Sequence, residues 1–65
     1  MTRFDQALTL AYDRIAASHG LDRADRLAVA VAGLPADVLA NFKHAADTTS
    51  VGGMAWMLEH GAVQL

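Results

Sequence analysis

The sequence contains no cysteine, and only one of its 65 residues is a proline. Without cysteine the chain can form no disulfide, has no thiol nucleophile and offers no thiolate to a metal. Its three histidines, His19, His44 and His60, lie too far apart in the sequence to form a local metal-binding motif. We therefore expect neither a metal nor another cofactor.

Long apolar runs are also missing, although 54% of the residues are hydrophobic. The longest uncharged run, Leu27 to Ala36, is interrupted by Gly33 and Pro35 and is far shorter than the roughly 20 residues of a spanning helix. Residues 1–5 do not have the charged-then-apolar layout of a signal peptide. These features predict a cytoplasmic protein that does not use a membrane as its partner.

Positive charge is scarce, with five Lys and Arg residues against seven Asp and Glu and a net charge of −2. A DNA-binding protein commonly neutralises about six to ten phosphates, so this balance weakens the case for DNA without excluding it. A chain this short forms one domain, residues 1–65, whose small core gives marginal stability. We therefore expect a homodimer or a complex with another protein, with spare apolar surface at Trp56, Val63 and Leu65.

Glycines followed by apolar residues divide the chain into four expected helices, near residues 3–19, 23–32, 35–46 and 51–60. Gly20, Gly33 and Gly61 are each followed by Leu or Ala, the pattern of a helix stop in which the glycine takes positive φ. The alternation of large and small residues over 27–32 would also suit a strand. Alanine propensity and Asp22 as an N-cap favour a helix there, so the predicted class is all-α.

The expected helix starts and faces follow from the same spacing. Thr2 with Asp5 forms a capping box, and Ser50 or Thr49 caps the last helix. Pro35 suits a first helical turn. In the last helix Met54, Met57 and Leu58 share one face, and Trp56 lies on the opposite side. Trp56 is then either an interface anchor or a core residue touched from a second side.

No residue pattern indicates catalysis. Ser18 and Ser50 stand where helix ends explain them, and Asp5, Asp22, Asp25 and Asp37 fall at helix starts, where a carboxylate complements the helix dipole. Acid-base chemistry would need carboxylates that converge in a shielded cleft. We therefore expect a protein that is not an enzyme and has no small-molecule substrate.

The stretch from Leu27 to Val63 resembles the helix-turn-helix of phage repressor, Cro and CII proteins. The resemblance rests on the turn glycine Gly33, the apolar Leu34 after it, and Leu39 and Phe42 on the following helix. The triplet 41–43, the joint 48–51 and the ending 54–63 are also similar, the ending most of all to CII activators. This likeness implies a helix-turn-helix unit at about 23–46, with Val29 where the family usually has a small alanine. An unrelated four-helix domain remains the alternative.

Two functions follow from this resemblance. The face that would enter the major groove carries Asp37, Ala40, Asn41, Lys43 and His44, a set with one full positive charge. The preferred hypothesis is a regulator that docks on a protein, such as an inhibitor or antirepressor, through Trp56 and the polar residues Asp37, Asn41, Lys43 and His44. The alternative is a sequence-specific DNA-binding transcription regulator that uses Arg23, Arg26, Asn41 and Lys43.

Overall fold

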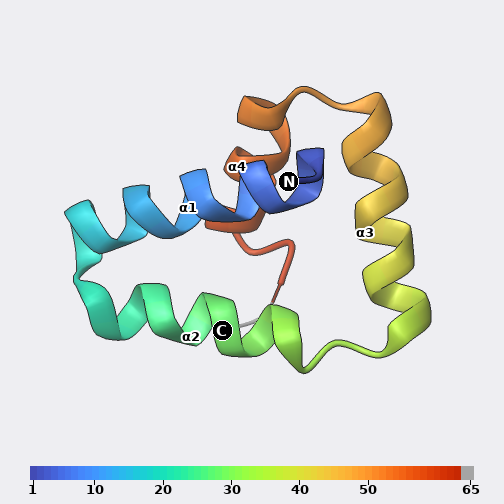
Figure 1. The fold of residues 1–65 in the computed structure, drawn as a ribbon. Helices are drawn as coiled ribbons and strands as arrows, with labels where there is room; N and C mark the ends of the chain where they lie inside the picture. The colour runs from blue at the N-terminus through green and yellow to red at the C-terminus, as the bar shows by residue number, and fades with distance from the viewer. Residues whose placement is uncertain (64–65) are drawn as a thin grey trace.

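The computed structural model describes residues 1–63, and this part of the chain is all-α. The four helices are α1 (Arg3–His19), α2 (Leu21–Ala32), α3 (Ala36–Thr48) and α4 (Val51–Glu59). The predicted helix across residues 27–32 is confirmed, since no strand forms among residues 1–63. Figure 1 shows α1 and α2 running side by side, α3 crossing at one end, and α4 behind α1.

The start of α1 is fixed by the predicted capping box. The backbone N–H of Asp5 donates to Thr2 Oγ1 at 3.1 Å, and the Thr2 N–H donates to the Asp5 carboxylate at 3.4 Å. These bonds satisfy amides that have no partner within the helix. They also lower the pKa of Asp5, first through the Thr2 hydroxyl, then through the Thr2 backbone, with a smaller contribution from the positive charge of Lys43.

Helix α2 begins two residues earlier than predicted, and Asp22 is not its N-cap. Gly20, at φ 94°, is the capping residue and makes no side-chain capping bond, while Asp22 lies in the first turn. The single glycine both ends α1 and begins α2, because its positive φ lets the chain reverse with no linker. Asp22 is therefore left as an exposed acidic residue near the positive end of the helix dipole.

Gly33 was expected at positive φ, and this prediction is wrong. Its φ is −88° and its ψ −1°, values typical of the third residue of a type I turn, and the Leu34 N–H donates to the Val31 carbonyl at 3.2 Å. Gly33 thus keeps a near-helical conformation and closes the last turn, and Leu34, the residue directly before Pro35, is the one that the proline disfavours from helical φ and ψ. Gly20 and Gly61 have the predicted positive φ, 94° and 98°.

The starts of the last two helices also differ in their caps. Pro35 is the N-cap residue of α3 and not a member of its first turn, and α3 continues to Thr48, two residues beyond the prediction. Ser50 caps α4 as expected, because its Oγ accepts the Gly53 N–H at 3.0 Å.

The inner face of α4 differs from the prediction at one residue. Met57 was expected to share the inner face with Met54 and Leu58 but is 36% exposed, and Ala55 is buried instead.

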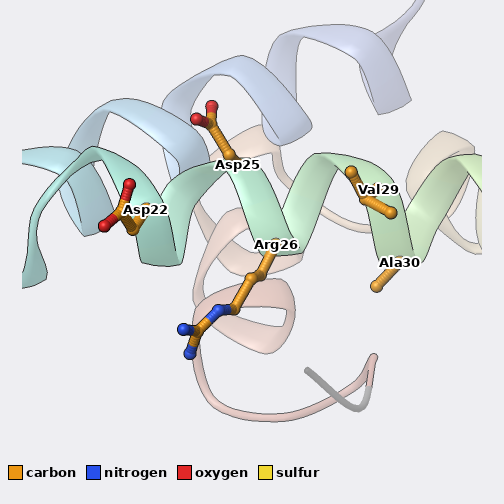
Figure 2. Close-up of a pocket in the computed structure, with 5 residues that line it drawn as sticks. All are labelled: Asp22, Asp25, Arg26, Val29 and Ala30. Carbon is orange, nitrogen blue, oxygen red and sulfur yellow. The ribbon is translucent and has the colours of Figure 1, made fainter.

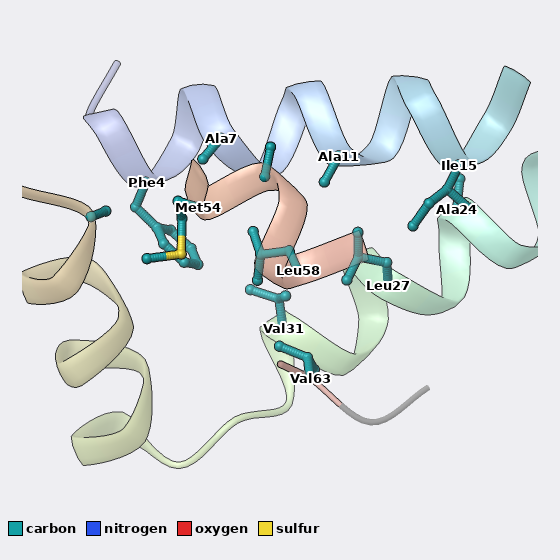
Figure 3. Close-up of a cluster of buried hydrophobic side chains, with 12 residues drawn as sticks. Phe4, Ala7, Ala11, Ile15, Ala24, Leu27, Val31, Met54, Leu58 and Val63 are labelled. Atoms are coloured by element: carbon teal, nitrogen blue, oxygen red, sulfur yellow. The ribbon is translucent and has the colours of Figure 1, made fainter. Parts of the chain in front are cut away.

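The core lies where α1, α2 and α4 meet (Figure 3). Alanines at positions 7 and 11 of α1 and 55 of α4 have no exposed surface, which allows these two helices to pack closely. Leu34, Leu39 and Phe42 are partly buried and pack against this core. The buried set is Phe4, Ala7, Ala11, Ile15, Ala24, Leu27, Val31, Ala46, Met54, Ala55, Leu58 and Val63.

The end of the described chain corrects one expectation. Val63 was predicted to be spare apolar surface, but it is buried against the core because the chain turns back after Gly61. Leu65, predicted to share that surface, lies outside the described residues. None of the helices in residues 1–63 is long and apolar enough to cross a membrane.

Candidate interaction surfaces

The outer face of α4 carries the largest exposed aromatic side chain that the structure describes. Trp56 is 58% exposed, whereas Met54, Ala55 and Leu58 on the inner face are almost fully buried. The interpretation of Trp56 as a second-side core residue is therefore wrong. Exposed Gly52 and His60, four residues before and after Trp56, share this outer face, and exposed Met57 lies at its edge. We call these four residues the Trp56 surface.

The indole of Trp56 is held by the imidazole of His60. The two rings stack with their centroids 4.2 Å apart and an interplanar angle of 18°. His60 Nδ1 lies 2.7 Å from the Trp56 carbonyl oxygen. Because a carbonyl can only accept, Nδ1 carries the proton in this contact. The stack restricts the tryptophan rotamer, so less conformational entropy is lost when a partner covers the ring.

The Trp56 surface itself carries no carboxylate, lysine or arginine. Glu59 is on the same helix but turns toward α1, where it meets Arg14 at 3.5 Å, and its side chain is only 12% exposed. The Arg14 side chain is 50% exposed, so this ion pair lies at the edge of the surface. Because the Arg14 side chain is half-exposed and the contact is as long as 3.5 Å, the pair contributes at most about 1 kcal/mol to stability. The centre of the surface is neutral and largely apolar.

The residues predicted on the outer face of α3 do not form one patch. Asp37, Asn41, Lys43 and His44 are all exposed. Asn41 and Lys43, however, point about 160° apart, because each residue of an α-helix turns by about 100°. The charge of Lys43 is near enough to Asp5 of α1 to lower its pKa, which places Lys43 on the flank of α3 nearest that helix. Only Asp37, Asn41 and His44 share the outward face.

Two of the five cations are engaged within the fold. Arg3 Nε donates to the Ala46 carbonyl at 3.0 Å, and its Nη2 donates to the Thr49 carbonyl at 2.7 Å. These oxygens lie at the end of α3, where carbonyls lack partners within the helix and the dipole favours a cation. Arg14 pairs with Glu59. This leaves Arg23, Arg26 and Lys43 with no recorded partner among the described residues.

Arg23 and Arg26 are exposed on α2, and two carboxylates, those of Asp22 and Asp25, lie on the same helix. A shallow depression on α2 is lined by Asp22, Asp25, Arg26, Val29 and Ala30 (Figure 2). All five residues come from one helix, so no second described element closes a cleft over them. Val29, which stands where the phage repressor family usually has a small alanine, is 71% exposed on this face and lies outside the core.

Asp25, one of the residues that line this depression, accepts a hydrogen bond at 2.5 Å from the Tyr12 hydroxyl of α1. This bond holds α1 against α2 and raises the pKa of Tyr12, because ionising the phenol would break the bond and place a second negative charge beside the carboxylate. Asp25 thus acts as an acceptor between two helices, a role that its predicted place in a capping pattern did not suggest.

Among the described residues, the one contact that resembles catalytic machinery has the wrong hydrogen-bond direction. Ser18 Oγ lies 2.8 Å from His19 Nδ1 but also donates its proton to the Arg14 carbonyl at 2.8 Å. The hydroxyl has a single proton, so His19 must act as the donor to Ser18. A nucleophilic serine would require the opposite arrangement. Within residues 1–63, no group of three His, Asp or Glu side chains could hold a metal ion.

Comparison with known proteins gives no relative from which to transfer a role. No family model matches the chain, and no match was found among curated proteins or solved structures. The functional argument therefore depends on the surfaces described above.

Several of these contacts were not predicted from the sequence, and two of them differ in how far the sequence could have indicated them. The Trp56–His60 stack had a usable signal, because residues four apart on a helix are neighbours. The Arg3 contact joins residues more than 40 positions apart. No local sequence pattern predicts the hydrogen bonds between Arg3 and the end of α3, because these segments meet only after the domain folds.

Proposed function

We propose that this chain is a regulatory domain without enzymatic activity that docks on a protein partner through the Trp56 surface. The observation that carries the proposal is the 58% exposure of a tryptophan that stacks on His60 in a neutral surface. Tryptophan is among the residues most enriched where interfaces concentrate their binding energy. The polar residues Asp37, Asn41 and His44 on α3 form a different face, available to a partner large enough to reach both helices.

The test compares two exposed apolar side chains on different helices. A partner captured from the native host with the wild-type chain is purified, and its affinity is measured by calorimetry. Trp56→Ala should cost about 2 kcal/mol or more of binding free energy, the size usual for an aromatic anchor. Val29→Ala on α2 is the matched control and should leave the affinity unchanged. Full affinity of a folded Trp56→Ala variant would refute the proposal.

Sequence-specific DNA binding is the second candidate. It is supported by the order of α2, a three-residue connection and α3, and by exposed Arg23, Arg26 and Asn41. Against it, Arg3 and Arg14 are engaged within the fold, so two copies present only about six available cations. A salt titration of binding to duplex DNA distinguishes the candidates, because a DNA-binding protein loses affinity steeply as salt rises. Asn41→Ala would then relax base preference.

A further inference from the structure

We infer that α3 is a separately unfolding segment, which loses its helix while α1, α2 and α4 remain packed, and that two hydrogen bonds from Arg3 control how often this happens. The Trp56 surface takes no part in this change. The inference therefore goes beyond the proposed function and does not rest on it.

Burial is lower in α3 than in the other helices. Ala46 is the only buried residue among the 13 of α3, whereas α1 buries four of 17 and α4 three of nine. Figure 1 shows α3 at the edge of the molecule, across one end of α1. Its apolar face is only partly buried and consists of Val38, Leu39, Phe42 and Ala45. A segment with few buried apolar side chains opens before the rest of a native protein.

The ends of α3 receive little support from neighbouring residues in the sequence. Among the described residues, no side chain caps its N-terminus, where Pro35 stands. Arg3 of α1 caps its C-terminus, since Nε donates to the Ala46 carbonyl at 3.0 Å and Nη2 to the Thr49 carbonyl at 2.7 Å. Both bonds require α3 to lie against α1. They therefore stabilise the packed form of α3 and not the opened one.

Short connections determine how α3 can open. Residues 33–35 join it to α2, and residues 49 and 50 join it to α4. Because α2 and α4 are both anchored in the core, α3 cannot swing outward as a rigid helix held at one end. It must lose its helix to leave α1, and a helix of 13 residues without packing is marginal in water. Opening and unfolding of α3 are therefore one event.

Unfolding of α3 removes the outward face formed by Asp37, Asn41 and His44. A partner that contacts this face binds only the folded segment, so it shifts α3 toward the folded form. A partner confined to the Trp56 surface has no such effect. The order of α3 is therefore a property that one kind of partner controls and the other does not.

Residue-resolved hydrogen exchange of the intact chain tests the inference. Amides in the middle of α3, such as that of Phe42, should be protected at least about tenfold less than those in the middle of α1. Their protection should also fall less steeply with urea, because opening of α3 exposes less surface than global unfolding.

Ile15→Val is the control, since Ile15 is buried in α1 at the end far from α3 (Figure 3). It weakens the core that stays packed when α3 opens. The protection of α1 should therefore fall about two- to tenfold while that of α3 is unchanged.

Arg3→Ala tests the residue that holds α3 in place. It removes both bonds from the packed form only, so the protection of α3 should fall at least about fivefold. Arg3→Lys keeps the charge but not the two-donor fork and should lie between wild type and Arg3→Ala. Trypsin gives a second readout. Lys43 of α3 should be cut before Arg14, Arg23 and Arg26, and faster in Arg3→Ala than in wild type.

Three results would overturn the inference. Equal protection and equal urea dependence in α3 and α1 would mean that α3 opens only by global unfolding. Protection that declines gradually toward both ends of α3 and is independent of urea would mean fraying. Unchanged protection of α3 in Arg3→Ala would remove the role of Arg3. The proposed function is tested separately, by the partner affinity of the Trp56→Ala variant.

Discussion

At the scale of single residues, residues of the same type have different roles at different places in the fold. Arg3 binds two carbonyls at the end of α3, whereas Arg23 and Arg26 lie exposed on α2. Gly20 is needed for its positive φ, Gly53 for the space its neighbours require, and Gly52 for neither. Composition treats these residues as equivalent, but only their surroundings determine which can be changed.

The two adjacent glycines of α4 give a matched pair of stability predictions. Gly52→Ala should raise the free energy of unfolding by up to about 1 kcal/mol, because alanine has the higher helix propensity and its methyl group meets open space. Gly53→Ala should gain little or lose stability, because its Cβ would approach Ser50 Oγ and the Thr49 methyl group at 3.0 and 3.1 Å. Urea unfolding followed by circular dichroism, at concentrations where the chain is monomeric, measures both. Equal stabilisation by the two variants would contradict this account.

At the scale of elements, helix ends control where each helix begins and how it joins the next. Thr2 and Ser50 act as N-caps through their hydroxyls, as local sequence predicted. The C-terminal end of α3 is capped by Arg3, a residue of another helix. The first kind of cap is encoded within four residues, and the second exists only once α1 and α3 meet.

The capping box of α1 predicts a defined loss of stability. Thr2→Ala removes the hydroxyl that accepts the Asp5 N–H and should cost about 1 kcal/mol of unfolding free energy. Thr2→Ser retains the acceptor and is the control, expected to remain close to wild type. Urea unfolding measures the difference. A Thr2→Ala variant as stable as wild type would show that water replaces the cap at no cost.

The lowered pKa of Asp5 predicts how this cap responds to acid. A carboxyl group whose folded pKa lies below its unfolded value of 3.8 stabilises the fold above that value, and this contribution is lost as pH falls through the folded pKa. Asp5→Asn should therefore lose less stability than wild type when pH is lowered from 5 to 3 (about the range that brackets the unfolded value). Thermal melts across this range test it. Parallel pH profiles for both proteins would contradict the prediction.

At the scale of the whole molecule, a small core must support four helices. Leu27 and Leu58 come from different helices, and neither has any exposed surface. Leu27→Ala should cost about 2 to 5 kcal/mol, a large share of the stability of a domain this small. Leu21→Ala on the same helix removes the same group from a side chain that is 64% exposed and should change stability far less. Thermal unfolding by circular dichroism compares them. A similar loss in both variants would show that the core is not where the structure places it.

The sequence by itself determined the features that local chemistry controls: the helical class, the capping box at Thr2, the Ser50 cap, the positive φ of Gly20 and Gly61, and the place of Trp56 off the inner stripe of α4. Each of these follows from residues within one or two helical turns. Tertiary structure decided that Val63 returns to the core, that Met57 does not enter it, and that Lys43 lies on the flank toward α1. It also joined Arg3 to the end of α3 and Tyr12 to Asp25. These outcomes depend on which faces meet when distant segments pack, and helical periodicity gives the direction of a side chain without naming the element that it meets.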